Sequence, residues 1–208
     1  MTVTTLALAV LLASTTSQAT DTPFGAVACA PLERGGYAVY GAAGYPELRV
    51  GFRQGFQGFE VGAEAGLGYL SMDFFATAAG RRTLLQRGAM NLALDAKLGG
   101  FVDAGSRWAV SDNRSEAGLR VEIGSSLTYK THWPLSWLAF VKVPAEIPFT
   151  SEGSVRVAGL LGGGAEIALS NEYFLLLNGA FGPDFRTHVP QSARLSVEAM
   201  LGFGYRVF

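Results

Sequence analysis

The C-terminal segment ARLSVEAMLGFGYRV, residues 193–207, alternates between two kinds of residue. Every second position from Ala193 to Val207 is apolar, and the positions between them are mostly polar, charged or small. Successive side chains of a β-strand point to opposite sides, whereas helical spacing would spread these apolar residues around the whole circumference. The pattern therefore predicts a β-strand over 192–207 with one apolar face.

The same two-faced pattern recurs along most of the chain, and no segment shows a convincing helical period. Residues typical of turns, such as glycine, proline, asparagine and serine, lie between the alternating segments. We therefore predict an all-β fold, an antiparallel up-and-down transmembrane β-barrel of ten strands. The predicted strands cover residues 35–43, 46–54, 57–69, 70–79, 88–103, 116–130, 135–146, 153–169, 172–182 and 192–207.

The number of strands depends on residues 57–79. The apolar phase flips between Tyr69 and Leu70 without a turn residue between them. If 57–79 forms one long bulged strand, a barrel of eight strands is the better count. Connections alternate in length in the second half of the chain, as in a barrel with tight turns on one rim and loops on the other. The short connections are 131–134 and 170–171, and the longer ones lie near 104–115, 147–153 and 183–191.

The polar face of these strands indicates which side meets water. It carries glycine, alanine and serine interrupted by charges of both signs, which suits the crowded interior of a small barrel better than an ordinary water-facing surface. Buried charges are tolerated when they are paired and hydrogen-bonded, and six acids here balance six bases. The predicted interior charges are Glu60, Glu64, Asp95, Lys97, Arg120, Glu122, Lys142, Arg156, Glu166, Arg194, Glu198 and Arg206.

The composition agrees with an apolar face that meets lipid. Charged residues make up 16% of the 208 residues, against roughly 25% in an average soluble domain. A net charge of -1 argues against nucleic acid as a partner. No apolar run approaches the roughly 18 residues of a membrane-spanning helix. Aromatic residues toward strand ends are typical of an interfacial girdle, and they are Tyr129, Trp133, Trp137, Tyr173, Phe203 and Tyr205.

The N-terminus resembles a secretory signal. Residues 1–19 contain an apolar core from Leu6 to Ala13 and end with small residues at Ser17 and Ala19, although no lysine or arginine precedes the core. A buried strand or helix is the alternative reading. Cys29 is a lone thiol, so we expect no internal disulfide. The predicted division is a signal peptide at 1–19, an N-terminal extension at 20–34 and the barrel at 35–208.

The signal-like start, the alternating segments and the ending GFGYRVF together resemble the small bacterial outer-membrane β-barrel proteins. The resemblance is one of class and matches no particular member. It implies a location in the bacterial outer membrane, membrane lipid as a partner, and recognition of the last strand by the barrel-assembly machinery. The residues read as that assembly signal are Phe203, Tyr205, Val207 and Phe208. Phe208 departs from the usual ending, because Arg206 stands where a second aromatic residue shares its face.

The chain offers little support for catalysis or for a cofactor. His132 and His188 each lack a second histidine nearby, so we expect neither a metal site nor a cofactor. Omptin-like barrel proteases use acidic residues and a histidine above the outer rim. Only His188 and Asp184 on the last long loop, with Asp103 and Asp112 on another, resemble that arrangement, and exposed loops collect such residues anyway.

A cluster of arginines, Arg81, Arg82 and Arg87, falls in a predicted connection. A solvated turn is the simpler interpretation, and contact with lipopolysaccharide phosphates is the functional one.

The resulting hypothesis is an outer-membrane barrel with a charged, side-chain-filled lumen. Its role would be structural, surface-binding or that of a narrow passage, rather than that of a general porin or an enzyme, and its ligand is unknown. One alternative is a barrel enzyme that acts on lipid or peptide at the extracellular rim. Another is a secreted soluble β-barrel that binds a small apolar ligand inside.

Overall fold

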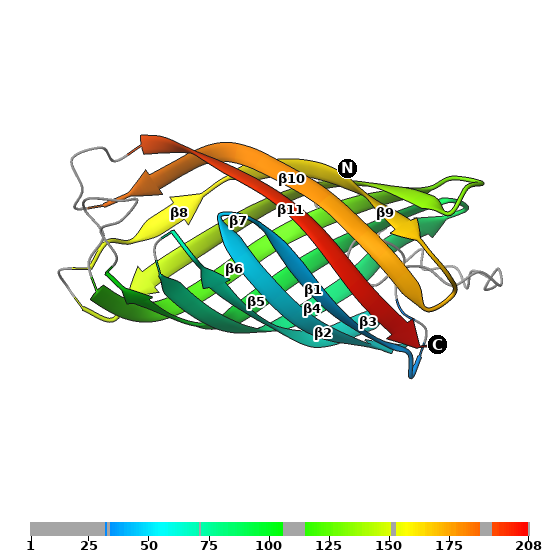
Figure 1. Ribbon diagram of the computed structural model, residues 1–208, viewed down its shortest axis with the longest axis horizontal. Coiled ribbons are helices and arrows are strands. Elements are labelled where there is room, and N and C mark those ends of the chain that lie inside the picture. Colours follow the sequence, from blue (N-terminus) through cyan, green and yellow to red (C-terminus); the bar gives the residue numbers. More distant parts are fainter. Residues whose placement is uncertain are drawn as a thin grey trace, which may run out of the picture.

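The computed structural model describes residue 32 and residues 34–70, 72–105, 115–150, 153–187 and 193–207. They form one antiparallel sheet that closes on itself, because β1 pairs with both β2 and β11. Figure 1 shows the strands wrapped around a long axis that lies horizontally. The strands are β1 (Tyr37–Tyr45), β2 (Glu47–Phe56), β3 (Phe59–Gly68), β4 (Asp73–Arg87), β5 (Met90–Ala104), β6 (Ser115–Lys130), β7 (Leu135–Pro148), β8 (Arg156–Ala158), β9 (Leu160–Ala168), β10 (Tyr173–Arg186) and β11 (Ala193–Val207).

β8 and β9 occupy one position in the barrel wall. Both pair with β7 on one side and with β10 on the other, and their register continues unchanged across Gly159. The barrel therefore has ten strand positions, as predicted. The alternative of eight strands is wrong, since β3 and β4 are separate strands. The turn between them contains Met72, whose positive φ of 57° bends the chain without a glycine or proline signal.

The stagger of the barrel follows from its register. Val39 of β1 pairs directly with Tyr205 of β11. If the direct partners are followed from Val39 through β2 and around the whole barrel, the row ends on β11 at Ala193. Ala193 and Tyr205 are twelve residues apart, and this number is the stagger of the barrel. With a rise of about 3.3 Å per residue and about 4.8 Å between strands, this stagger gives a tilt of about 40° and a backbone radius of about 10 Å. The row runs through Phe52, Ala63, Ala78, Leu98, Val121, Ala145, Val157 and Phe185.

The two rims differ in their connections. At the terminal rim, where β1 begins and β11 ends, the chain turns within residues 57–58, 88–89, 131–134 and 169–172. Gly58 and Gly88 take positive φ angles of 81° and 56° there, which tight hairpin turns require. The opposite rim, called the loop rim, is where β1, β3, β5, β7 and β10 end, and its described connecting residues are 46, 69, 70, 72, 105, 149, 150, 153–155 and 187. The loop rim is on the left in Figure 1.

The wall is low at β1 and β2. These strands have 9 and 10 residues, whereas β5, β6 and β11 have 15, 16 and 15. Figure 1 shows the β1–β2 turn well short of the loop rim. The register of β1 with β11 ends at the pair Tyr45 and Ala199, so residues 193–198 of β11 pair with β10 alone. The barrel mouth at the loop rim therefore has a gap in its wall beside residues 193–198 of β11, called the open flank.

Inside the barrel, aromatic rings lie on glycines of the neighbouring strand. In each case the ring residue and the glycine are direct partners in the sheet, and a Cβ added to the glycine would lie 2.1–2.7 Å from the nearest ring atom. Glycine is therefore required there for close approach of a ring rather than for backbone freedom. The five pairs are Tyr40 with Gly51, Phe75 with Gly66, Phe101 with Gly118, Phe140 with Gly162, and Phe174 with Gly204.

Candidate functional site

The charged residues predicted for the interior all lie on the face opposite the exposed apolar side chains. Glu60 and Arg206 are each 2% exposed and Glu166 is 3% exposed, whereas the outward-facing Val50 and Ile123 are both 61% exposed. The structure adds interior charges that the sequence reasoning missed. These are Glu47, Arg49, Arg53, Arg81, Asp103, Glu116, Glu146, Asp184 and Arg186.

One chain of ion pairs joins opposite walls of the barrel. Glu198 of β11 lies 2.6 Å from Lys142 Nζ of β7 and 3.7 Å from Arg49 Nη2 of β2. Because β2 and β7 are five strand positions apart in a barrel of ten, they lie on opposite sides. The three side chains therefore extend across the full width of the interior.

A second set of ion pairs lies beside this chain. Lys97 Nζ lies 3.0 Å from Glu64 and 3.1 Å from Glu122. Arg49 contacts Glu47 and lies 3.7 Å from Glu64, which joins the two sets. Charges removed from water are stabilised only when they are paired, and each of these side chains has at least one partner of opposite sign.

Arg120 adds a further crossing. It lies 3.8 Å from Glu47 of β2 and 3.4 Å from Glu146 of β7. Its guanidinium group lies 3.9 Å from the centre of the Phe75 ring, a distance typical of a cation–π contact. Phe75 in turn lies flat on Gly66, so the ring and the charge are both held in place.

A cavity of about 110 Å³ remains beside the ion pairs. Its lining includes charged groups such as Lys97, Glu122 and Lys142 and the apolar side chains of Leu138, Leu176 and Met200. A volume of this size holds a few water molecules or a small polar molecule.

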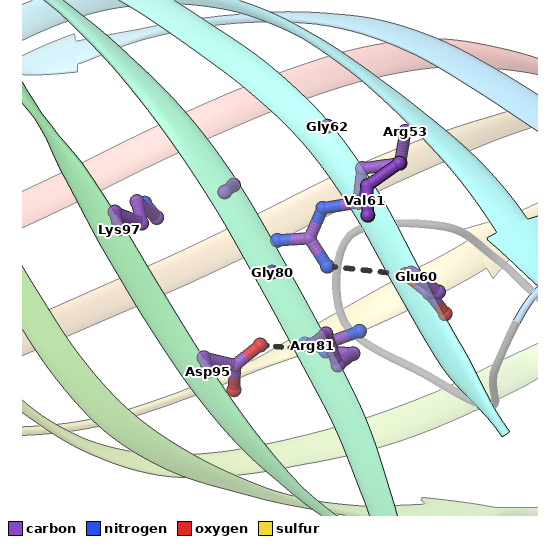
Figure 2. A pocket seen from close by; sticks show the side chains of 9 residues that line it. Arg53, Glu60, Val61, Gly62, Gly80, Arg81, Asp95 and Lys97 are labelled. Carbon is purple, nitrogen blue, oxygen red and sulfur yellow. Dashed lines mark hydrogen bonds and ion pairs between the residues drawn. The ribbon is translucent and has the colours of Figure 1, made fainter.

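A separate cluster lies toward the terminal rim (Figure 2). Arg81 Nε donates to Asp95 Oδ1 at 2.6 Å, and Arg53 Nη1 lies 3.6 Å from Glu60 Oε2. Glu60 also accepts a hydrogen bond of 2.9 Å from the backbone N–H of Leu32. The space between these groups is only about 10 Å³, enough for one water molecule.

Leu32 closes the terminal end of the interior. It is 2% exposed and packs with Ala38, Tyr40 and Phe174. At the same end of the barrel, Arg206 pairs with Glu166 at 3.1 Å, and both side chains are almost fully buried. Leu32, which precedes β1 by five residues, therefore lies inside the terminal end of the barrel.

The placement predicted for the three arginines is wrong. Arg81, Arg82 and Arg87 belong to β4, not to a connection, and Arg81 points inward to Asp95. The alternation breaks there because the register with β5 shifts between Thr83 and Leu85. Arg87 borders the short turn of the terminal rim, and the arginines therefore do not form the exposed cluster that contact with lipopolysaccharide would need.

The loop position predicted for Asp184 is also wrong. It belongs to β10 rather than to a loop, is 5% exposed, and lies 2.9 Å from Arg156 Nε. His188 and Asp112, the other parts of the omptin-like arrangement, lie outside the described residues, as do residues 1–31 and Phe208. Asp103 is not on a loop either, because it belongs to β5, is 9% exposed, and accepts a hydrogen bond from the backbone N–H of Gly105. Asp184 is thus engaged in an ion pair inside the barrel.

The outer face carries aromatic residues near the terminal rim. Tyr173 stacks on Phe203 with ring centres 5.7 Å apart, and it also contacts Tyr205 at 5.2 Å. Phe56 stacks on Phe59 at 5.0 Å across the β2–β3 turn. Phe203 and Tyr205 of the predicted assembly signal thus lie in this girdle, while their recognition by assembly machinery stays a prediction.

The described residues contain no group of three or more histidine, cysteine, aspartate or glutamate residues placed to hold a metal ion. The same residues include no helix that is long and apolar enough to span a membrane.

Comparisons with known proteins found similarity to solved structures only. No family model and no curated protein matches it. It is similar to the KdgM porin in complex with disordered oligogalacturonate, at 9% identity and a TM-score of 0.45, covering 83% of this chain and 99% of that one.

Two further solved structures are similar at lower scores. Neisserial surface protein A has 11% identity and a TM-score of 0.28 over 82% of this chain and 92% of its own. The N-terminal β-barrel domain of Pseudomonas aeruginosa OprF has 10% identity and a TM-score of 0.26 over 84% and 98%.

Proposed function

We propose that the chain is an integral barrel of the bacterial outer membrane whose interior is closed to free diffusion of solutes. A sheet that spans a membrane must leave no unpaired strand edge in lipid. This sheet closes on itself, and the part of β11 that pairs on one side alone is residues 193–198 at the loop rim. The outer aromatic residues Phe59 and Tyr69 lie ten residues apart along the same wall. At a tilt of about 40° this is a height of about 25 Å, which matches the apolar band of such barrels.

The orientation follows from the two rims. Outer-membrane barrels have short turns on the periplasmic side and longer loops outside the cell. The terminal rim, with its tight turns, would therefore face the periplasm, and the loop rim would face the exterior.

The single observation that carries the proposal is the ion-pair chain Arg49–Glu198–Lys142. It spans an interior whose backbone diameter is only about 20 Å, and Leu32 adds a second closure toward the periplasm. A barrel closed in this way would act through its outer rim or as a structural element of the membrane, and not as a general porin. The charged interior also disfavours the alternative of a soluble barrel that binds an apolar ligand.

Conductance in planar lipid bilayers tests the proposal. We expect the purified full chain to insert without porin-like conductance steps. A variant in which Arg49, Glu198 and Lys142 are changed to alanine together with Arg120 and Leu32 should conduct. Both crossings and the terminal closure are then removed, while the strands remain paired to their neighbours.

The matched control is the double variant Arg81→Ala/Asp95→Ala. It also removes a buried ion pair, but one between neighbouring strands that does not cross the interior. We expect this variant to stay closed. Stable porin-like steps from the unmodified chain would contradict the proposal.

A further inference from the structure

Three arginines converge on one wall of the loop rim. Arg156 of β8 and Arg186 of β10 are direct partners in the sheet, and Arg194 of β11 is the direct partner of Asp184. Since alternate residues share a face, all three guanidinium groups belong to the inner side of the mouth. Like charges placed directly opposite each other in a sheet repel, so this arrangement needs negative charge nearby.

Among the described residues, two carboxylates lie within ion-pair distance of Arg156 and Arg186, and both are shared. Asp184 Oδ2 serves both Arg156 Nε at 2.9 Å and Arg186 Nη2 at 3.8 Å. The other carboxylate in reach, Glu146, is divided between Arg156 at 3.5 Å and Arg120 at 3.4 Å. In the part of the chain that the structure describes, Arg156 and Arg186 therefore have no carboxylate to themselves on this wall.

Arg186 also has a donor without an acceptor. Its Nε atom is buried and has no hydrogen-bond partner among the described residues. A buried N–H without an acceptor costs free energy that a bound anion would recover. The guanidinium fork of arginine matches the oxygen atoms of carboxylate and phosphate groups in two parallel hydrogen bonds.

The cluster is accessible to a ligand. The side chains of Arg156 and Arg186 are 27% and 28% exposed, unlike the nearly sealed Arg206 at 2%. Arg194 also lies in residues 193–198 of β11, the part that extends past the low wall of β1 and β2. A ligand can therefore approach from the mouth or along the open flank.

From these observations we infer that Arg156, Arg186 and Arg194 form a binding site for an oxyanion, a carboxylate or phosphate group carried by a ligand at the loop rim. The site lies on the β8–β10–β11 wall, above the ion pairs that close the interior. It holds its ligand whether or not the barrel conducts, so it is independent of the proposed closure.

Calorimetric titration of the detergent-solubilised full chain with inorganic pyrophosphate and with citrate tests this inference. Arg186→Gln should weaken binding by about tenfold or more, because it removes a charged hydrogen bond and leaves the pair between Arg156 and Asp184 intact. Arg87→Gln, an arginine lost from the opposite rim, is the matched control and should bind like the unmodified chain.

A second variant separates a binding role from a structural one. Asp184→Asn removes the carboxylate that competes with the ligand for the arginines, so binding should become several-fold tighter. If the arginines were only structural, this variant would leave anion binding unchanged or weaken it. Heat-modifiable migration on a gel checks that each variant is folded, and Arg194→Gln replaces Asp184→Asn if the latter does not fold.

The source of the anion is decided by competition with lipid. Vesicles that contain a phosphorylated lipid should displace pyrophosphate if the ligand is a headgroup, whereas the absence of displacement assigns a soluble ligand. Absence of binding to either anion, or equal binding by Arg186→Gln and the unmodified chain, would overturn the inference.

Discussion

Replacing Gly204 by alanine tests whether the interior glycines are needed for the close approach of aromatic rings. A Cβ at this position would lie 2.1 Å from Cζ of Phe174. Ordinary carbon contacts are about 3.5–4.0 Å, so the ring would have to move by about 1.5 Å. Phe174 is 0% exposed, and Leu32, Tyr40 and the Arg206 guanidinium surround it, so it has little room to move.

The magnitude follows from the cost of overpacking. Forcing an extra methyl group into such a site costs about 1–3 kcal/mol. Gly41→Ala is the matched control, because it lies on β1 close by and its added Cβ would meet its nearest atom, the backbone oxygen of Arg49, at 3.9 Å. Without a clash, alanine should stabilise that strand by about 0.5–1 kcal/mol. The two variants should therefore differ by about 1.5–4 kcal/mol and have opposite signs.

The assay is reversible urea unfolding in lipid vesicles followed by tryptophan fluorescence. The double variant Gly204→Ala/Phe174→Leu should recover part of the loss, because the smaller side chain leaves room for the new methyl group. Equal stability of Gly204→Ala and Gly41→Ala would refute the reasoning, since it would mean that the ring is not held against the glycine.

Two further predictions use the same unfolding titration. Ile123→Arg places a charge at an outward position in the middle of the apolar band and should lower the free energy of unfolding by about 2–4 kcal/mol. Leu169→Arg, beside the terminal turn, should lower it by about 1 kcal/mol or less. Equal losses would argue against a membrane-facing outer wall. Arg206→Met removes the guanidinium group that pairs with the buried Glu166 at 3.1 Å and should cost about 3–5 kcal/mol. Adding Glu166→Leu should restore most of this stability, and a double variant as unstable as the single one would contradict the assignment.

The sequence by itself predicted the elements wherever the alternation was unbroken. Residues 88–103, 116–130 and 192–207 became β5, β6 and β11 within two residues at each end. Period two is a local property of a strand, so it requires no knowledge of neighbouring strands. The same alternation in β2 puts Leu48, Val50 and Phe52 on one face of the strand and Glu47, Arg49 and Arg53 on the other. It therefore predicts that these three charged residues face inward, although they are absent from the interior charges predicted above.

The tertiary structure decided where local patterns were interrupted. β4 continues to Arg87 although the register shift between Thr83 and Leu85 breaks its alternation, and the turn at Met72 carries no glycine or proline. A bulge moves all following side chains to the other face, so a strand that contains one does not look periodic in sequence.

The partners of the interior charges were likewise beyond the sequence. Alternation places Lys142 and Glu198 on the inner face, but it contains no information on which strands stand opposite each other. Their 2.6 Å ion pair depends on the closure of the sheet and on its stagger of twelve residues. The sequence therefore determined which side chains face inward, and only the closed barrel decided which of them meet, because register between strands is a property of the whole sheet.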